Sequence, residues 1–290
     1  DVQACQKETD EARMIIASIP HMGLGEASDV RASVNRASRE VILLGSELLE
    51  IKTTLVSARE LKLTLSPFVS EAPRMALLWE EITDAPAVVD AISRTLDDRA
   101  EVLDSASKQL TDTRRNLRIC HDNLLPDLQS LIDDPRNLDY LQDPIITQRG
   151  DRYVIPVKAH SRGRFRGIVH AKSSSGATLF IEPIATVELN NRLRELQSEE
   201  EEEILRIMAY LSSLVAECAD LITSTVEVLA KIDLCFAKAR YSHEINASAP
   251  ILLPILPGSS SHSGSIIRLR DARHPLLDPK TVVPIDVVLD

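Results

Sequence analysis

The stretch that decides the fold is residues 204–239, which read ILRIMAYLSSLVAECADLITSTVEVLAKIDLCFAKA. Eleven of its residues, which we call the seam, recur at alternating steps of three and four, and ten of them are apolar. This is the heptad spacing of a helix that packs along one side. Thr225 is the only break in this apolar seam. If residues 187–241 form one helix, its 55 residues make a rod of roughly 80 Å, so we expect an elongated, mainly helical molecule. The seam consists of Ile204, Ile207, Leu211, Leu214, Cys218, Leu221, Thr225, Val228, Ile232, Cys235 and Ala239.

A second helical pattern lies earlier in the chain. Residues 87–125 contain no glycine or proline, and apolar residues recur among them at helical spacing. The first 85 residues predict shorter helices over 9–17, 29–38 and 47–65, the last with Ser46 as a candidate N-cap. These shorter helices would form a body from which two long helices extend.

The composition of the 290 residues agrees with a helical protein. Hydrophobic residues make up 44% and charged residues 27%, so the chain can bury a core and is not a disordered tail. Glycine and aromatic residues are scarce, which favours helices over a sandwich or barrel. The four cysteines lie far apart and predict free buried thiols in a reducing cytosol, rather than a zinc site or a disulfide framework. No stretch resembles a membrane span or a signal peptide, so we expect a cytoplasmic protein.

The segment between the two helical stretches has a different period. In 152–158 apolar side chains alternate with polar ones, as in a half-buried strand, and Pro156 indicates an edge strand or a bulge. Further strands are predicted over 164–170 and 177–181, joined by the serine-rich turn at 173–176. Two long helices that run out and back would place this small antiparallel β module at their far end, as a tip on an arm.

Charge is distributed unevenly along the chain. The net charge is −11, which excludes a globally basic nucleic-acid binder. Residues 145–172 nevertheless carry seven basic side chains against one acid, Asp151, while residues 182–203 carry eight glutamates against two arginines. A basic tip beside an acidic arm would attract a polyanion to one end only. The alternative is a solvated surface whose arginines pair with the nearby glutamates. The candidate nucleic-acid-binding residues are Arg149, Arg152, Lys158, Arg162, Arg164, Arg166 and Lys172.

Other features of the chain indicate no catalytic chemistry. His160 and His170 have no acid or cysteine at ligand spacing, so we expect surface histidines and no metal site. The glutamate run 199–203 predicts a solvated helix face. The sequence of 173–176 favours a plain β-turn over the alternative, a loop whose backbone N–H groups bind a phosphate. No GxxxxGK[ST], HExxH, GxSxG or GxGxxG motif occurs, so no catalytic centre is predicted.

The β module contains three motifs in succession: RYVIPVK at 152–158, GIVH at 167–170 and SSSGATLFIEP at 173–183. Supporting stretches are EVLD at 101–104, DLCFAKARY at 233–241 and ARHPLL at 272–277. Together they resemble the MutS family, in its second bacterial branch (MutS two), over essentially the whole chain. Because Asp1 is not a natural start, we expect a fragment or a processed chain.

This resemblance implies a helical core, long antiparallel lever helices, a small antiparallel β clamp at the tip, and the start of a truncated α/β ATPase domain. The implied parts are the core and ascending lever helix (1–134), the clamp (135–203), the descending lever helix and core (204–250), and a linker with the beginning of the ATPase domain (251–290). At the edge of that domain, His274, Val283 and Pro284 are implied to lie beside a nucleotide. Ile285 departs there from the family's VPND-like strip and removes a polar side chain. The resemblance implies no cofactor in this chain, and ATP and Mg²⁺ in the full-length protein.

The leading hypothesis is a non-catalytic segment of a homodimeric ATPase that holds branched or duplex DNA by its phosphates and suppresses recombination. The resemblance also implies a C-terminal endonuclease domain in the full-length protein. One alternative is a ribosome-associated factor that binds the ribosomal RNA of collided ribosomes and splits them with its ATPase. A second is a coiled-coil scaffold that dimerises through the heptad seam and binds no nucleic acid.

Overall fold

The chain is mainly helical and carries two small antiparallel sheets, which confirms the predicted fold class. The computed structural model describes residues 2–252, 267–278 and 280–289. The proline-, serine- and glycine-rich part of the predicted linker lies outside the described residues, namely Pro254, Pro257, Gly258 and Ser259–Ser261. Two compact units are formed: unit 1 comprises Asp1–Ala27, Leu55–Asp84 and Thr223–Asp290, and unit 2 comprises Ser28–Thr54 and Ala85–Ile222.

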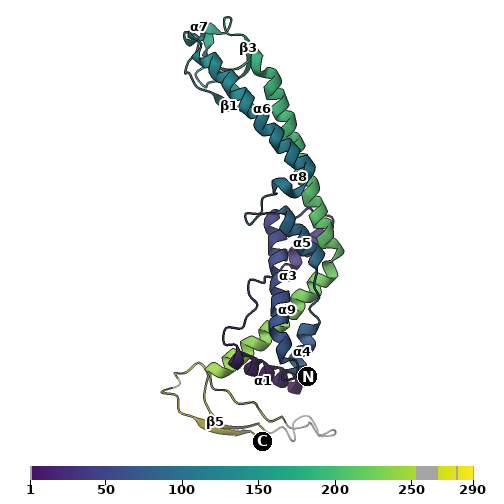
Figure 1. Cartoon of the computed structure of the whole chain (residues 1–290). Coiled ribbons are helices and arrows are strands. Elements are labelled where there is room, and N and C mark those ends of the chain that lie inside the picture. The colour runs from purple at the N-terminus through teal and green to yellow at the C-terminus, as the bar shows by residue number, and fades with distance from the viewer. Residues whose placement is uncertain (1, 253–266, 279, 290) are drawn as a thin grey trace. The chain divides into compact units, whose positions relative to one another are not determined.

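Unit 2 is built around a pair of long helices, α6 (Lys108–Asp133) and α8 (Val187–Glu217). They lie side by side along much of their length, and a small sheet sits at the end where α6 finishes and α8 begins (Figure 1). This confirms a β module at one end of a helix pair. The other helical elements with residues in unit 2 are α2 (Arg31–Ala37), α3 (Gly45–Leu65), α5 (Pro86–Thr95), α7 (Pro135–Leu138), the start of α9 (Ala219–Glu244), and the 3-10 turns η2 (Asp104–Ala106), η3 (Ala159–Ser161) and η4 (Ile184–Thr186).

The stretch 87–125 does not form one helix, contrary to the prediction. Helix α5 ends at Thr95, and α6 begins only at Lys108. The physical reason is Asp97, whose carboxylate accepts hydrogen bonds from the N–H groups of Arg99 and Glu101, both at 2.9 Å. An aspartate side chain that accepts hydrogen bonds from the N–H groups of the residues that follow it favours a turn over a continued helix.

A proline usually breaks a helix interior, and Ser46 is predicted as an N-cap; the structure departs from both expectations. Pro126 lies inside α6, where it removes only the hydrogen bond to the Asp122 carbonyl, on an exposed turn of the helix. Ser46 is not the N-cap of α3, because the helix already includes it. The capping role belongs to Glu47, whose carboxylate accepts the N–H of Leu44 at 3.0 Å.

The predicted helix over 187–241 is divided at Cys218 into α8 and α9 (Ala219–Glu244). The N–H of Cys218 bonds to the carbonyl of Val215 at 3.2 Å, three residues back, instead of continuing the regular ladder. Around the break the buried positions shift by one residue, to Val215 and Ile222 in place of Leu214 and Leu221. The predicted seam positions that are buried are Ile207, Leu211, Thr225, Val228, Ile232, Cys235 and Ala239.

The sheet of unit 2 has four antiparallel strands in the order β1-β2-β4-β3. Strand β2 covers the residues predicted for it, and β4 and β3 begin one to three residues later than predicted. Ladder pairs such as Ile155 with Ile181 and Val157 with Leu179 set the register, and a bulge interrupts β3 between Val169 and Ala171. The strands are β1 (Thr147–Arg149), β2 (Arg152–Lys158), β3 (Gly167–Lys172) and β4 (Thr178–Pro183).

Strand β2 is not an edge strand, contrary to one of the two predictions from Pro156. Strand β1 pairs with β2 only as far as Val154, so Pro156 lies beyond the reach of β1. The Pro156 carbonyl accepts the N–H of Gln142 at 3.0 Å on the side away from β4. The missing proline N–H also faces that side, so the ladder between β2 and β4 loses no bond.

One face of the sheet packs on the helix pair and forms the core of this end of unit 2. The strands contribute Ile155, Val157, Leu179 and Ile181, and the helices contribute Cys120, Leu124, Leu128, Ile132, Leu193 and Leu196. Strand β2 is covered on its opposite face as well, because Val154 and Pro156 are also buried.

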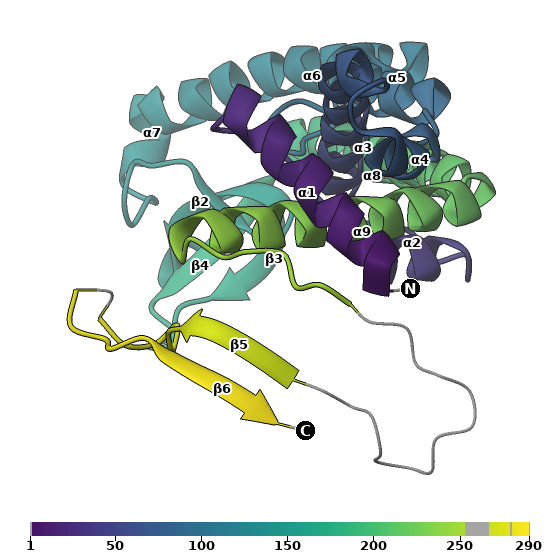
Figure 2. The same ribbon diagram turned by 90° about the horizontal axis from the view of Figure 1, so that it is seen from below.

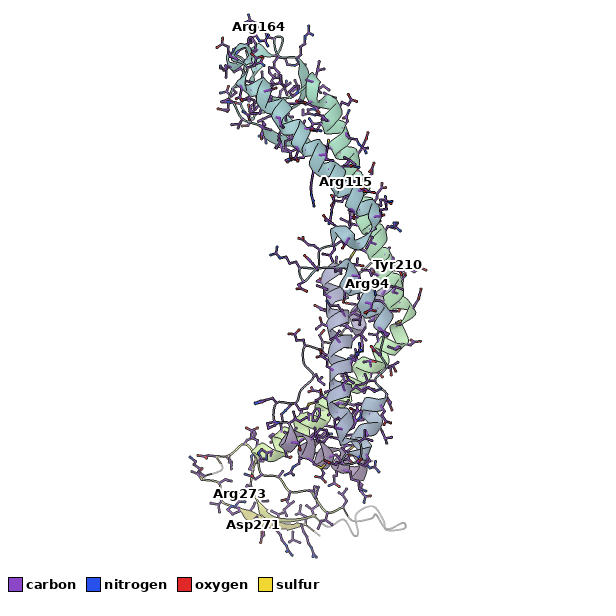
Figure 3. The ribbon with its side chains drawn as sticks, viewed as in Figure 1. Arg94, Arg115, Arg164, Tyr210, Asp271 and Arg273 are labelled. Carbon is purple, nitrogen blue, oxygen red and sulfur yellow. The ribbon has the colours of Figure 1, made fainter. Side chains whose placement is uncertain are left out.

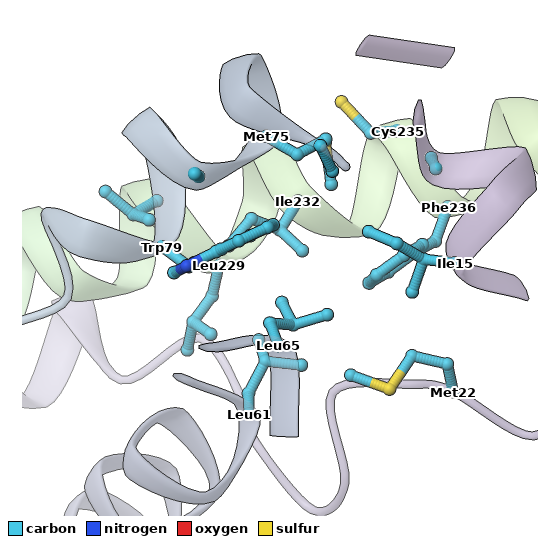
Figure 4. Packing of buried hydrophobic residues seen from close by; sticks show 14 of the residues in the cluster. Ile15, Met22, Leu61, Leu65, Met75, Trp79, Leu229, Ile232, Cys235 and Phe236 are labelled. Atoms are coloured by element: carbon cyan, nitrogen blue, oxygen red, sulfur yellow. The ribbon is translucent and has the colours of Figure 1, made fainter. Parts of the chain in front are cut away.

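Unit 1 has its own core, in which Trp79 and Phe236 are the largest fully buried side chains (Figure 4). Helix α1 (Val2–Ser18) crosses α9 and places Ile15 in this cluster (Figure 2). Helix α4 (Pro73–Glu80) and the second half of α3 complete it, and the 3-10 turn η1 (Ser66–Phe68) follows α3.

The last described residues form a two-stranded antiparallel hairpin of β5 (Ile267–Ala272) and β6 (Ile285–Leu289) (Figure 2). The short apolar runs over 266–269 and 282–289 are typical of strands in the sequence, and Ile266 lies outside the described residues. All four cysteines are free thiols; Cys120 and Cys235 are buried, whereas Cys5 is exposed. Within the described part of the chain, no helix has both the length and the apolar character needed to cross a bilayer.

Replacing Thr225 with valine is expected to raise the free energy of unfolding by about 1 kcal/mol. Thr225 is 1% exposed, and its hydroxyl has no hydrogen-bond partner among the described residues. The measurement is the midpoint of urea unfolding. The matched control is Thr54→Val, because the equally buried Thr54 hydroxyl accepts the N–H of Ser28 at 3.1 Å and its removal should destabilise. A lower midpoint for Thr225→Val would contradict the prediction.

Candidate nucleic-acid interface

The predicted basic residues lie on or beside the sheet of unit 2, at the end of the helix pair. Figure 3 shows Arg164 at this end, with Arg115 part of the way along α6. Of the seven predicted residues, six have no carboxylate within ion-pair distance in the described part of the chain. We call these six the unpaired cations: Arg149, Lys158, Arg162, Arg164, Arg166 and Lys172.

Three of the unpaired cations alternate along the loop that follows η3. Arg162, Arg164 and Arg166 are exposed, while Phe165 between them is buried in the sheet core. The N–H groups of Arg164 and Phe165 both bond to the Ser161 carbonyl, at 3.0 and 3.3 Å. The buried ring and these bonds anchor the loop, so the three arginines project outward from a fixed backbone.

Two guanidinium groups rest on aromatic rings. The Arg149 guanidinium lies 3.9 Å from the centre of the Phe180 ring, and that of Arg164 lies 5.9 Å from the centre of the Tyr140 ring. A cation over an aromatic face is attracted by the ring quadrupole, which restricts its rotamers without neutralising its charge. Both arginines therefore stay available to an external anion.

The two unpaired lysines lie at the end of the sheet near the turn 173–176. Lys158 donates to the carbonyl of Asp139 at 3.1 Å, and Lys172 is exposed. The turn itself is closed, because the N–H of Gly176 bonds to the Ser173 carbonyl and the N–H of Thr178 bonds to the Ser173 hydroxyl. This is a plain β-turn with few backbone donors left over for a phosphate.

Arg152 differs from the other six basic residues because it is held inside the protein. Its guanidinium donates to Glu182 at 2.8 Å and to Asn191 at 2.7 Å, and its side chain is only 19% exposed. Glu182 is completely buried, and its second oxygen meets Nε2 of His170 at 2.6 Å. His170 is exposed, as predicted for a surface histidine, but its ring also joins Arg152 in contacting the buried Glu182.

A second contact joins this region of the sheet to α8. Asn190 is fully buried, and its side-chain amide both accepts the N–H of Tyr153 at 3.1 Å and donates to the Tyr153 carbonyl at 3.2 Å. The amide thereby pairs with β2 as a neighbouring strand would. The sheet and the first turn of α8 are consequently fixed to each other.

The glutamate run 199–203 is only partly the solvated face that was predicted. Glu203 is buried, and it accepts hydrogen bonds from Ser107 and from Nε and Nη2 of Arg206. The Arg206 bonds, with Ser107 adding to them, hold the pKa of Glu203 below its usual value. Glu200 bonds to Arg114 at 2.6 Å, which ties α8 to α6.

Arg114 also fixes the loop before α6. It donates to Asp104 at 2.6 Å, and this hydrogen bond lowers the pKa of Asp104. Glu201 and Glu202 remain exposed without an ion-pair partner in the described chain. The helix pair thus keeps an acidic surface beside the unpaired cations.

The nucleotide-side residues implied by the resemblance lie near the hairpin of β5 and β6. His274 Nδ1 accepts the N–H of Leu276 at 3.2 Å, and Val283 and Pro284 are exposed. Their role beside a nucleotide stays a prediction. Among the described residues, no group of three or more histidine, cysteine, aspartate or glutamate side chains could hold a metal ion.

The fold and its charged end define a mainly helical protein that presents a small cation-rich sheet. Curated relatives are each named "Endonuclease MutS2": those of Geobacillus sp. (strain WCH70), Geobacillus thermodenitrificans (strain NG80-2) and Shouchella clausii (strain KSM-K16) are 42%, 39% and 39% identical to it. Each alignment covers all of this chain and 36% of the relative's length. No protein-family model matches the chain. On these relatives, the chain belongs to the MutS2 family.

Proposed function

We propose that this chain is a non-catalytic clamp, lever and core segment that holds DNA by its phosphate backbone. The observation that carries the proposal is the set of six unpaired cations gathered on one small sheet. In the rest of unit 2 most described cations have carboxylate partners, as Arg114, Arg118 and Arg206 do. Cations left without internal partners are suited to external phosphates.

The chemistry of the surface favours backbone contacts over base recognition. Phosphate contacts position a protein on DNA without reading sequence, and arginine and lysine are the side chains that make them. The DNA would be branched or duplex, held by shape and charge. Exposed Glu201 and Glu202 on α8 repel phosphates and confine the DNA to the sheet end.

For the whole protein, we propose a homodimeric ATPase that uses this segment to bind DNA and restrain recombination. The relatives are named endonucleases, and we extend that activity to the whole protein as part of the proposal. ATP and Mg²⁺ would act in the ATPase domain, with His274, Val283 and Pro284 at its edge.

The test is a salt titration of DNA binding by the chain. If all six unpaired cations contact phosphates, the logarithm of the binding constant should fall against the logarithm of salt concentration with a slope of about −5. The double variant Arg162→Ala, Arg164→Ala should weaken binding and reduce that slope by about 2. Fluorescence anisotropy with labelled linear and branched duplexes measures both quantities.

The matched control is the double variant Arg94→Ala, Arg115→Ala, which removes the same charge. Arg94 lies on α5 and Arg115 on α6, away from the sheet (Figure 3), and both make ion pairs. This control should bind DNA nearly as the unmodified chain does. Equal losses for the two double variants, or no measurable DNA binding by the chain, would contradict the proposal.

A further inference from the structure

Two exposed isoleucines lie among the unpaired cations. Ile168, on β3, is 48% exposed, and Ile184, directly after β4, is 62% exposed. Large aliphatic side chains are usually buried, so two of them beside each other at a charged surface call for a physical account.

The strand register brings these side chains to the same side of the sheet. Gly167 pairs with Pro183 and Ile168 with Glu182. The N–H of Ile184 then bonds to the Arg166 carbonyl at 3.3 Å, which continues the ladder by one step. Ile184 is therefore opposite Arg166 and diagonal to Ile168, a separation of roughly 7–8 Å in an antiparallel pair.

The apolar pair has cations around it and firm support beneath it. Arg166 is exposed, opposite Ile184 and two residues before Ile168, directly ahead of β3. The Arg162 guanidinium is held at the Gly167 carbonyl, 3.1 Å away. Directly across from Ile168 is Glu182, fixed by its bonds to Arg152 and His170. The strand opposite Ile168 is therefore held in place by side-chain hydrogen bonds as well as by the ladder.

These observations select the partner. An apolar surface alone would fit many proteins, but flanking cations without carboxylate partners favour a polyanion. A polyanion that offers an apolar contact between its charged edges is duplex DNA, whose minor groove has sugar and base edges between two rows of phosphates.

We propose that Ile168 and Ile184 insert as an aliphatic wedge into the minor groove of duplex DNA whose phosphates are held by the neighbouring arginines. This inference rests on the proposed function and adds a contact that does not depend on charge. Aliphatic wedges in the minor groove unstack a base step and bend the duplex. Flexible pyrimidine–purine steps unstack most easily, so DNA with a central TA step binds better than DNA with a stiff A-tract.

The experiment compares the unmodified chain with the double variant Ile168→Ala, Ile184→Ala. Each is bound to two short DNA duplexes, one with a central TA step and one with a central A-tract. The variant is expected to bind the TA duplex roughly tenfold more weakly, because two apolar contacts are lost. Its salt slope stays unchanged because no charge is removed. End-to-end energy transfer on the labelled TA duplex reports bending by the unmodified chain and none by the variant. The matched control is Leu205→Ala, an exposed aliphatic residue on α8.

The outcomes separate this inference from the proposed function. Unchanged affinity of the isoleucine variant, together with loss of affinity in Arg162→Ala, Arg164→Ala, overturns the wedge and leaves phosphate binding standing. No DNA binding by the unmodified chain overturns both. If the isoleucine variant loses as much affinity for duplex RNA as for duplex DNA, the minor-groove assignment is overturned, because the minor groove of A-form RNA is wide and shallow. The double variant Ile168→Thr, Ile184→Thr keeps β-branched residues in the sheet and is used if the alanine variant folds poorly. It should show the same loss of DNA affinity.

Discussion

Replacing Glu182 with alanine is expected to lower the free energy of unfolding of the chain by about 3 kcal/mol or more. Glu182 is completely buried and neutralises Arg152, whose side chain is largely buried as well. Removal of one partner of a buried pair leaves the other charge without compensation, which costs more than the pair contributes. His170 loses its 2.6 Å contact in the same step, so three strands lose a shared anchor.

The measurement is chemical unfolding followed by far-ultraviolet circular dichroism, with Glu188→Ala as the matched control. Glu188 is an exposed glutamate in the first turn of α8, six residues after Glu182, and it makes no ion pair with any described residue. Its replacement should change stability by less than about 0.5 kcal/mol. If the two variants unfold at the same denaturant concentration, the contacts of the buried Glu182 do not stabilise the sheet.

The Glu182→Ala variant also distinguishes the effect of folding on DNA binding from the effect of charge. Loss of Glu182 raises the net charge of the sheet by one unit and leaves all six unpaired cations in place. At temperatures where the variant is still folded, DNA should therefore bind at least as well as it does to the unmodified chain. Weaker binding by the folded variant would mean that Arg152 must be held in its internal position for DNA to bind.

Local patterns in the sequence were sufficient for the elements whose causes are local. The period of two over 152–158 predicted β2, although the strand is buried on both faces from Val154 to Val157 and is not half-buried as expected. The seven cations counted over 145–172 predicted a charged end of the sheet. In the structure, six of these seven side chains have no carboxylate partner among the described residues. The heptad seam likewise predicted most of the buried positions of α9.

Features that arise from tertiary contacts could not be predicted in this way. Glu182 acts through Arg152, which is 30 residues away, and through His170, which is 12 residues away, and no local pattern joins the three. One signal could have suggested them: a single carboxylate in the otherwise apolar strand 179–183, next to a segment rich in cations. Glu203 had no such signal, since four further glutamates precede it and only burial against Ser107 distinguishes it.

Substitution of Gly167 by alanine is expected to destabilise the sheet by about 3 kcal/mol, because this strand position has no room for a side chain. A Cβ atom there would lie 2.3 Å from the Glu182 carbonyl oxygen and 2.4 Å from Cγ2 of Ile181, both on β4. The first of these neighbours is backbone, so the strain can be relieved only if β3 moves away from β4. That movement would also shift Ile168 and Arg166, and DNA affinity should fall together with stability.

Gly163→Ala is the matched control for this prediction, because Gly163 lies in the same arginine-bearing loop and nothing lies within 4 Å of a Cβ atom built there. Its replacement should leave stability within about 0.5 kcal/mol of the unmodified chain and keep DNA binding intact. Hydrogen exchange of the β3 and β4 amides distinguishes a local opening of this ladder from unfolding of unit 2. Faster exchange confined to β3 and β4 in Gly167→Ala, with the α6 and α8 amides still protected, would show that the helix pair holds its structure without a fully formed sheet. Protection retained throughout β3 would mean that the ladder tolerates a side chain at Gly167, and the steric argument would then be wrong.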